Sequence, residues 1–214
     1  SSALAGRLTR LGIPASPADV LAALELSGEA IRRRLGPVRV LALGTDEMRQ
    51  VLEAAGHAVV PPGAWQEARA VLVGNDPAFD FARLRAAARA VAIGAAFFTV
   101  NLDPRLPVGP DEFDPGCGAL AEAVAVAGGA RPVVVGKPYR PIFEMALERL
   151  GCRPDEAAMV GDSVATDVAG GRGAGMFTVW LDASGDGGEA GGADLTVRSL
   201  HELRERWRGG RLLS

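Results

Sequence analysis

Short apolar runs alternate with longer helix-like segments along the chain, and this alternation predicts an α/β protein. Strands are predicted at residues 38–44, 68–74, 95–101, 131–136, 157–161, 177–181 and 194–197. Helices are predicted at residues 45–56, 79–94, 119–129, 141–151 and 199–207. Runs such as "VVVG" and "AAMVG" show no polar alternation, which is typical of parallel strands that are covered on both faces. The pattern therefore predicts a parallel sheet between layers of helices.

A proline- and glycine-rich stretch divides this pattern into two blocks. It covers Leu106–Gly118 and is typical of a hinge or of a crossover between domains. Residues 16–107 are predicted to form one α/β domain and residues 108–214 most of a second.

Composition narrows the class of protein. The 214 residues are 48% hydrophobic and 23% charged with a formal net charge of -3, which suits a folded domain without the positive field that nucleic-acid binding needs. No run approaches ~18 apolar residues, so no membrane span is expected, and no signal peptide is visible. Cys117 and Cys152 are too few for a disulfide framework, so a cytoplasmic protein is predicted.

Two charged residues each come directly after a predicted strand. Lys137 follows the run that ends at Gly136, and Asp162 follows the run that ends at Gly161. Because ligands sit beyond the carboxyl ends of parallel strands, a cation and an anion are expected at the same sheet edge. A lysine suits a phosphate, and the carboxylates of Asp162 and Asp167 suit Mg²⁺. These residues alone leave two readings open: a phosphate and Mg²⁺ site, or a surface lysine and a capped turn.

Two longer motifs resemble a known family. "VVVGKP" and "AMVGDSVATDVAGGRGAGMFTVWL" resemble the lysine and acidic motifs of phosphatases of the haloacid dehalogenase (HAD) superfamily. The form is that of subfamily IIA, which includes nitrophenylphosphatases, phosphoglycolate phosphatases and NagD-like nucleotide phosphatases. "LAGRLTRLGIPASPADV" and "TVNLDPRLP" resemble the segments that lead into and out of that subfamily's cap. The resemblance implies a Rossmann-like HAD core, without its N-terminal part, and an inserted α/β cap domain at residues 16–107. Residues 1–15 would then be a remnant of the core that leads into the cap, and residues 108–214 would be the C-terminal part of the core.

The resemblance also implies a role for each site residue. Lys137 would hold the phosphoryl oxygens as the catalytic lysine, Asp162 would bind Mg²⁺, and Asp167 would support the metal or its water. Gly161 would permit a tight turn. The cap residues that would face a small phosphorylated metabolite are Asp76, Asn101 and Asp103. The segment "TVNLD" is one residue longer than the form usual in the family. An α/β cap with an apolar surface could also pair with the cap of a second copy, so a homodimer is possible.

The family's nucleophile is not found in this chain. The reaction needs an aspartate nucleophile and a second aspartate in a D-x-D segment after the first strand, and no D-x-D occurs in the 214 residues. We therefore expect an incomplete Mg²⁺-dependent phosphatase that begins after about one βαβ unit and is inactive as given. Because the missing strand is central in the family, its loss is expected to leave an open sheet edge. The alternative is a non-catalytic HAD-fold protein that binds an anion or a partner.

A weaker motif suggests a third function. "GCGALA" at Gly116–Ala121 fits the dinucleotide fingerprint G-x-G-x-x-A. It follows "DEFDP" rather than a strand, so a structural turn is favoured over a nucleotide-cofactor enzyme.

Overall fold

The apolar runs of the first 136 residues form one parallel sheet. Its strands, in the order β2-β1-β3-β4-β7, are β1 (Arg39–Leu43), β2 (Ala58–Val60), β3 (Ala70–Val73), β4 (Ala96–Thr99) and β7 (Val133–Val134). Every neighbouring pair is parallel. The computed structural model describes residues 2–185 and 190–209. It divides into an N-terminal unit, Ser1–Gly136, and a C-terminal unit, Lys137–Ser214.

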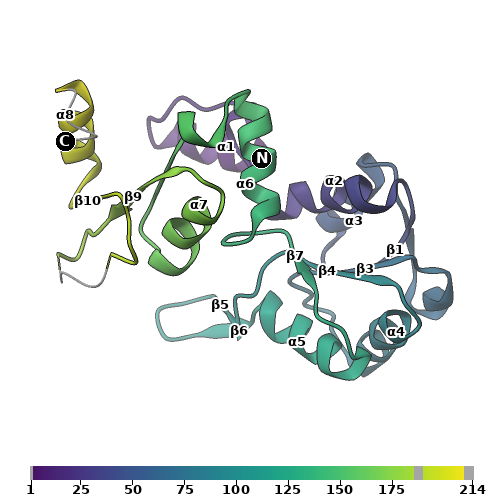
Figure 1. The fold of residues 1–214 in the computed structure, drawn as a ribbon. Coiled ribbons are helices and arrows are strands. Elements are labelled where there is room, and N and C mark those ends of the chain that lie inside the picture. The colour runs from purple at the N-terminus through teal and green to yellow at the C-terminus, as the bar shows by residue number, and fades with distance from the viewer. Residues whose placement is uncertain (1, 186–189, 210–214) are drawn as a thin grey trace. The chain divides into compact units, whose positions relative to one another are not determined.

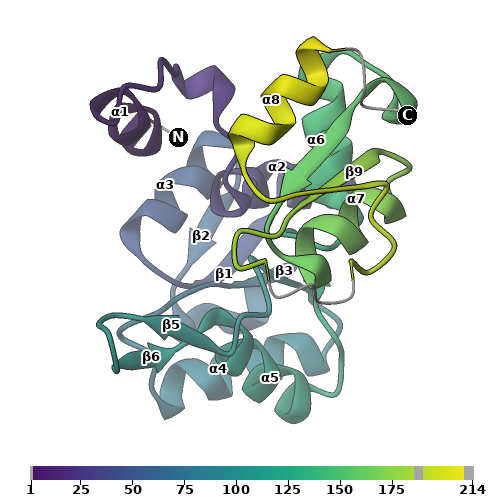
Figure 2. The ribbon, with the colours of Figure 1, turned by 90° about the vertical axis from the view of Figure 1, so that its left-hand side faces the viewer.

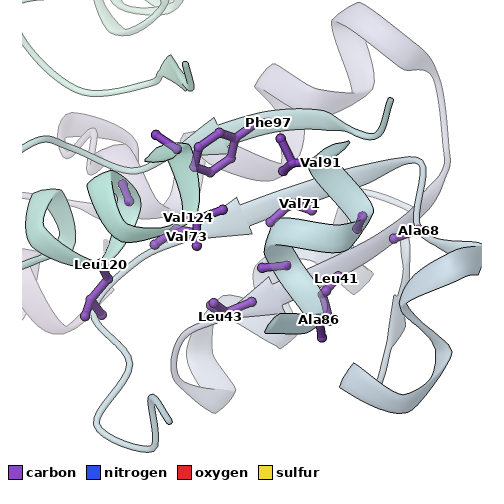
Figure 3. Close-up of a cluster of buried hydrophobic side chains, with 14 of the residues drawn as sticks. Leu41, Leu43, Ala68, Val71, Val73, Ala86, Val91, Phe97, Leu120 and Val124 are labelled. Atoms are coloured by element: carbon purple, nitrogen blue, oxygen red, sulfur yellow. The ribbon is translucent and has the colours of Figure 1, made fainter. Parts of the chain in front are cut away.

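Two layers of helices bury both faces of the N-terminal sheet (Figure 1). Helices α2 (Ala23–Leu35) and α3 (Asp46–Ala54) cover one face, and α4 (Phe81–Ala92) and α5 (Cys117–Gly128) cover the other. Because side chains alternate along a strand, successive residues enter different cores. Figure 3 shows the core under α4 and α5, where the sheet contributes Leu41, Leu43, Val71 and Val73. Burial on both faces explains why these strands lack polar positions.

The structure groups residues 2–15 and 108–136 with the N-terminal unit, whereas the prediction from the sequence assigned them to the second domain. Thr99 of β4 pairs with Val134 of β7, and α5 buries Leu120 and Val124 in the core of the N-terminal sheet. The N-terminal unit therefore continues past the Leu106–Gly118 stretch, because strand pairing and core packing on its far side decide the boundary, and not its proline and glycine content. Which residues act as cap and which as core stays a prediction.

A second, smaller parallel sheet lies in the C-terminal unit. Its order is β10-β9-β8, with β8 (Ala158–Gly161), β9 (Phe177–Leu181) and β10 (Leu195–Val197). Its helices are α6 (Arg140–Leu150), α7 (Ala169–Gly173) and α8 (Leu200–Arg208). The strand before Lys137 and the strand before Asp162 thus belong to different sheets. The expectation that one sheet edge carries both residues is therefore wrong.

Strand β8 is an edge of this second sheet. Within the described residues it pairs only with β9, and Ala158 and Val160 are exposed, Val160 by 37%. Met159 packs instead against the apolar cluster of Phe143 and Leu147 from α6. The backbone groups along this edge are therefore free to pair with a further strand.

An antiparallel hairpin occupies the predicted hinge. Strand β5 (Arg105–Pro107) pairs with β6 (Phe113–Pro115), and the hairpin contacts α5 of the same unit (Figure 2). The Arg105 guanidinium lies 4.3 Å from the centre of the Phe113 ring. The remaining α-helix is α1 (Ser2–Arg10), and the 3₁₀ turns are η1 (Pro17–Asp19), η2 (Pro62–Glu67) and η3 (Pro154–Glu156). Among the described helices, none has the length and apolar character needed to cross a membrane.

Candidate functional site

The lysine motif and the acidic motif meet through an ion pair. Lys137 Nζ lies 2.6 Å from Asp167 Oδ1. The Asp167 side chain is only 5% exposed, whereas that of Lys137 is 42% exposed. The carboxylate is therefore buried and paired, and part of the ammonium group's side chain reaches solvent. A charge-assisted hydrogen bond of this kind is stronger than a neutral one.

The acidic loop runs from the end of β8 into a widened helical turn. Asp162 follows Gly161 and is exposed. Ser163 then caps the turn, because its Oγ accepts a hydrogen bond from Thr166 N at 3.3 Å. The turn, η4 (Val164–Val168), has π-helical geometry and continues into α7. Such π turns often mark functional sites.

Asp167 connects this loop to the lysine with both of its carboxylate oxygens. Oδ1 takes the Lys137 ion pair, and Oδ2 accepts a hydrogen bond from Ser163 N at 3.2 Å. Its position in the first turn of a helical segment also suits a negative charge. A single buried side chain therefore holds the lysine and the residue next to Asp162 in one arrangement.

Gly161 is required by a close approach and not by a left-handed turn. It is absent from the residues with positive φ. A Cβ added there would lie 2.2 Å from Asp167 Oδ2 and 2.3 Å from Asp167 Cγ. The sequence therefore predicted the wrong reason for a glycine at this position. Gly161 is needed because the Asp167 carboxylate lies directly against its backbone and leaves no room for a Cβ.

No pattern in the sequence predicted a contact between β9 and this loop. Trp180 of β9 donates its indole N–H to the backbone carbonyl of Asp162, with Nε1 and O 3.1 Å apart. Only the strand register, which sets Trp180 opposite Gly161, brings the two together.

Known proteins with similar sequences and folds place the chain in a family. The HAD-hydrolase-like family model matches residues 134–201. Human glycerol-3-phosphate phosphatase is 34% identical over 204 residues, which are 83% of this chain and 63% of that protein. The 5'-nucleotidase YutF of Bacillus subtilis is 31% identical over 176 residues, or 82% of this chain and 67% of that protein. The p-nitrophenyl phosphatase structure from Archaeoglobus fulgidus superposes with a TM-score of 0.85 at 28% identity, covering 95% of this chain and 80% of that one.

The chain belongs to the HAD-like hydrolase family. Its relatives are phosphatases, consistent with subfamily IIA. The chain spans about three-fifths of the length of most of the curated relatives, such as 63% of the human protein and 64% of human chronophin.

The acidic loop of this HAD-like chain offers one free carboxylate to a metal ion. Asp162 is exposed, and within the described residues no hydrogen bond or ion pair engages its carboxylate, whereas both oxygens of Asp167 are engaged. No group of three or more His, Cys, Asp and Glu side chains suited to a metal occurs in residues 2–185 and 190–209. Mg²⁺ commonly takes only one or two carboxylates and completes its shell with water and phosphate, so Asp162 fits such an ion. HAD phosphatases generally use a divalent metal ion, and a relative from Mycobacterium tuberculosis was solved with calcium.

The three predicted substrate residues lie in the N-terminal unit. Asp76 follows β3 and is buried, where it accepts hydrogen bonds from Arg83 Nε at 2.8 Å and from Ala78 N at 3.0 Å. Asn101 and Asp103 follow the neighbouring β4, and Asn101 Oδ1 accepts a hydrogen bond from Asp103 N at 3.1 Å. Asp103 itself is exposed. Their part in substrate binding stays a prediction.

A cavity of about 440 Å³ opens beside Asp76, and no pattern in the sequence predicted it. It lies at the carboxyl ends of β1, β2 and β3, where the strand order reverses and where α/β sheets often bind ligands. Its polar lining residues are Thr45, Asp46, Arg49, Asp76 and Arg83.

The glycine fingerprint is structural. Gly116 N donates to Pro104 O, and Gly118 N donates to Asp103 O. A Cβ at Gly118 would lie 2.2 Å from Leu102 O. The start of α5 therefore packs directly against the preceding segment, which supports the turn over the nucleotide site.

Proposed function

We propose that this HAD-like protein hydrolyses small phosphomonoesters and that these 214 residues supply the lysine and the acidic loop of the site. The observation that carries the proposal is the bridge made by Asp167, which bonds Lys137 and the Ser163 amide at once. A buried, paired carboxylate that orients a half-exposed lysine is an arrangement suited to holding a phosphoryl group. Similarity to phosphatases at 34% and 37% identity supports the same reaction class.

Each residue has a distinct part in the proposed reaction. The Lys137 ammonium neutralises charge on the phosphoryl oxygens, which stabilises the transition state of phosphoryl transfer. Asp167 keeps that ammonium in place. Asp162 is proposed as the carboxylate ligand of Mg²⁺, which as a bound ion supplies further charge neutralisation at the phosphate.

The nucleophile is proposed to come from sequence outside these 214 residues. The family resemblance assigns this role to a D-x-D strand in the centre of the sheet. The open edge of β8, with Val160 37% exposed, offers a place for a further strand to pair. Without a nucleophile, Lys137 and Asp162 provide only electrostatics and positioning.

The substrate is proposed to be a small phosphorylated metabolite, because the relatives are named for glycerol-3-phosphate, nucleotides and p-nitrophenyl phosphate. Asp76, Asn101 and Asp103 are proposed to act on the substrate side as cap residues. A homodimer through the cap and a cytoplasmic location belong to the same proposal.

Phosphate release from p-nitrophenyl phosphate tests the proposed function. The chain of 214 residues is expected to give no turnover with Mg²⁺. The same chain extended by a D-x-D strand, taken from its own reading frame, is expected to give Mg²⁺-dependent turnover that Asp162→Asn lowers by at least about a hundredfold. Asp111→Asn, in the turn between β5 and β6, is the matched control and is expected to retain activity. An extended protein that folds but releases no phosphate from a metabolite panel would favour the non-catalytic HAD-fold protein.

A further inference from the structure

The peptide bond between Asp162 and Ser163 is held at both of its polar atoms. Its carbonyl oxygen accepts the indole N–H of Trp180 at 3.1 Å, and its N–H donates to Asp167 Oδ2 at 3.2 Å. Because a peptide unit is planar, fixing its C=O and its N–H fixes the orientation of the whole group. The carboxylate of Asp162 branches from the Cα at one end of this plane.

Strand pairing fixes the residue on the other side of Asp162. Gly161 is the last residue of β8 and lies opposite Trp180 in the parallel register with β9. The backbone before Asp162 is thus part of a sheet, and the backbone after it is held by Trp180 and Asp167. The Asp162 side chain is exposed at this point, so a rigid backbone presents a free carboxylate.

We propose that Trp180 is a positioning residue for the metal ligand Asp162, and that it acts with Asp167 to hold the Asp162–Ser163 peptide. The inference rests on the proposed function, because it takes Asp162 to be the metal ligand. Trp180 is not itself proposed as a ligand, because its indole N–H is bonded to the Asp162 carbonyl; that bond restricts the directions in which the Asp162 carboxylate can point. Groups that orient metal ligands in this way commonly change metal affinity by about 10- to 100-fold when they are removed.

The proposal predicts a specific loss of metal affinity. Trp180→Phe removes the donor and keeps an aromatic ring in β9. We expect it to weaken binding of Tb³⁺, a hard cation used here as the probe, by about tenfold, the lower end of that range. Replacing Trp180 with benzothienylalanine exchanges the N–H for sulfur at nearly the same shape, so it should cause a similar loss with the fold retained.

Calorimetric titration of the chain with Tb³⁺, and competition by Mg²⁺, measure this affinity. Excitation of the indole adds a second readout, because a tryptophan close to a bound Tb³⁺ sensitises its emission. Trp207→Phe is the control, since Trp207 lies in α8 of the same unit and is 65% exposed. It should leave both the affinity and the sensitised emission unchanged, whereas Trp180→Phe should abolish the emission.

The outcomes separate this inference from the proposed function. If Asp162→Asn abolishes Tb³⁺ binding and both Trp180 variants bind within twofold of the parent, the positioning role is wrong and the metal ligand stands. If Asp162→Asn also binds like the parent, or if the parent does not bind Tb³⁺, then Asp162 is not a metal ligand in this chain and both proposals fail. Reduced affinity in the benzothienylalanine protein, with an unchanged melting temperature, supports the positioning role.

Discussion

Asp167 shows how one residue can set the geometry of several others. Its carboxylate is 5% exposed and is engaged by the Lys137 ammonium and the Ser163 amide. A buried charge is tolerated only when it is paired and hydrogen-bonded, so each of these contacts depends on the others. Gly161 makes the arrangement possible because it has no Cβ where the carboxylate lies.

Gly161→Ala is expected to destabilise the C-terminal unit. The new Cβ would lie 2.2 Å from Asp167 Oδ2 and overlap it. The Asp167 side chain is short, and both of its oxygens are hydrogen-bonded, so it cannot move away without breaking one of those bonds. We expect a loss of about 1–3 kcal/mol in the free energy of unfolding, as for other overpacked sites. Urea unfolding followed by circular dichroism measures this loss.

Gly173→Ala is the matched control for that substitution. Gly173 ends α7, is exposed, and has no atom within 4 Å of an added Cβ. Since alanine favours helix, the control should be neutral or stabilising by up to about 1 kcal/mol. Equal losses in the two variants would show that the Asp167 contact does not decide the effect.

At the scale of elements, strand pairing places the residues that the sequence could only mark as candidates. The apolar runs predicted most of the strands, and the paired motifs predicted Lys137, Asp162 and Asp167 as one constellation. The sequence could not show that β7 and β8 belong to different sheets, because that depends on which strands pair. The contact of Trp180 with the Asp162 carbonyl was equally hidden, since it follows from the register of β8 and β9.

The Asp194 carboxylate, just before β10, accepts two hydrogen bonds from Thr178 of β9. The stability that these bonds contribute should depend on pH. The hydrogen bond from the Thr178 hydroxyl is the larger cause, and the bond from the Thr178 amide is the next; together they hold the pKa of Asp194 below its usual value. A carboxyl whose folded pKa is lowered stabilises the protein above its unfolded pKa, near about 4, and this contribution disappears as the pH falls through the folded pKa. Because Asp194 is largely exposed, we expect the contribution to be below about 1 kcal/mol.

Melting temperatures of the parent and of Asp194→Asn between pH 7 and pH 3 test this dependence. The parent should be the more stable protein at pH 7, and the difference should shrink below about pH 4. Asp111→Asn, in an exposed turn, is the control and should show no such convergence. A difference that grows on acidification would contradict the assignment.

At the scale of the whole molecule, the chain consists of two units with separate sheets and separate cores. The N-terminal unit buries Leu72 between strand and helix, and the C-terminal unit buries Leu147 beside Phe143. The sequence predicted two blocks, but it placed their division near Leu106–Gly118. The pairing of β4 with β7 moves the division to Gly136, because long-range strand pairing is invisible to local composition.

Two unfolding transitions are expected from this division. Leu72→Ala should cost about 2–5 kcal/mol and lower only the transition of the N-terminal unit. Leu147→Ala should lower only the other transition. Differential scanning calorimetry distinguishes two separate transitions from a single one. A single transition whose midpoint both variants lower would mean that the two units unfold together.

Among residues 2–185 and 190–209, one edge of β8 has no strand partner, and this edge has a consequence for the behaviour of the chain in the cell. An apolar strand that no neighbour covers can template pairing with any other extended segment, including its own copy. Chains of this form should therefore engage chaperones and proteases unless a pairing strand reaches them. Val160→Lys should raise the soluble yield by placing a charge on that edge, with Val126→Lys on the outside of α5, which is 74% exposed, as the comparison. An equal gain in soluble yield from both variants would mean that the added positive charge, and not its position on β8, causes the gain. The open edge of β8 would then not be a special site of aggregation.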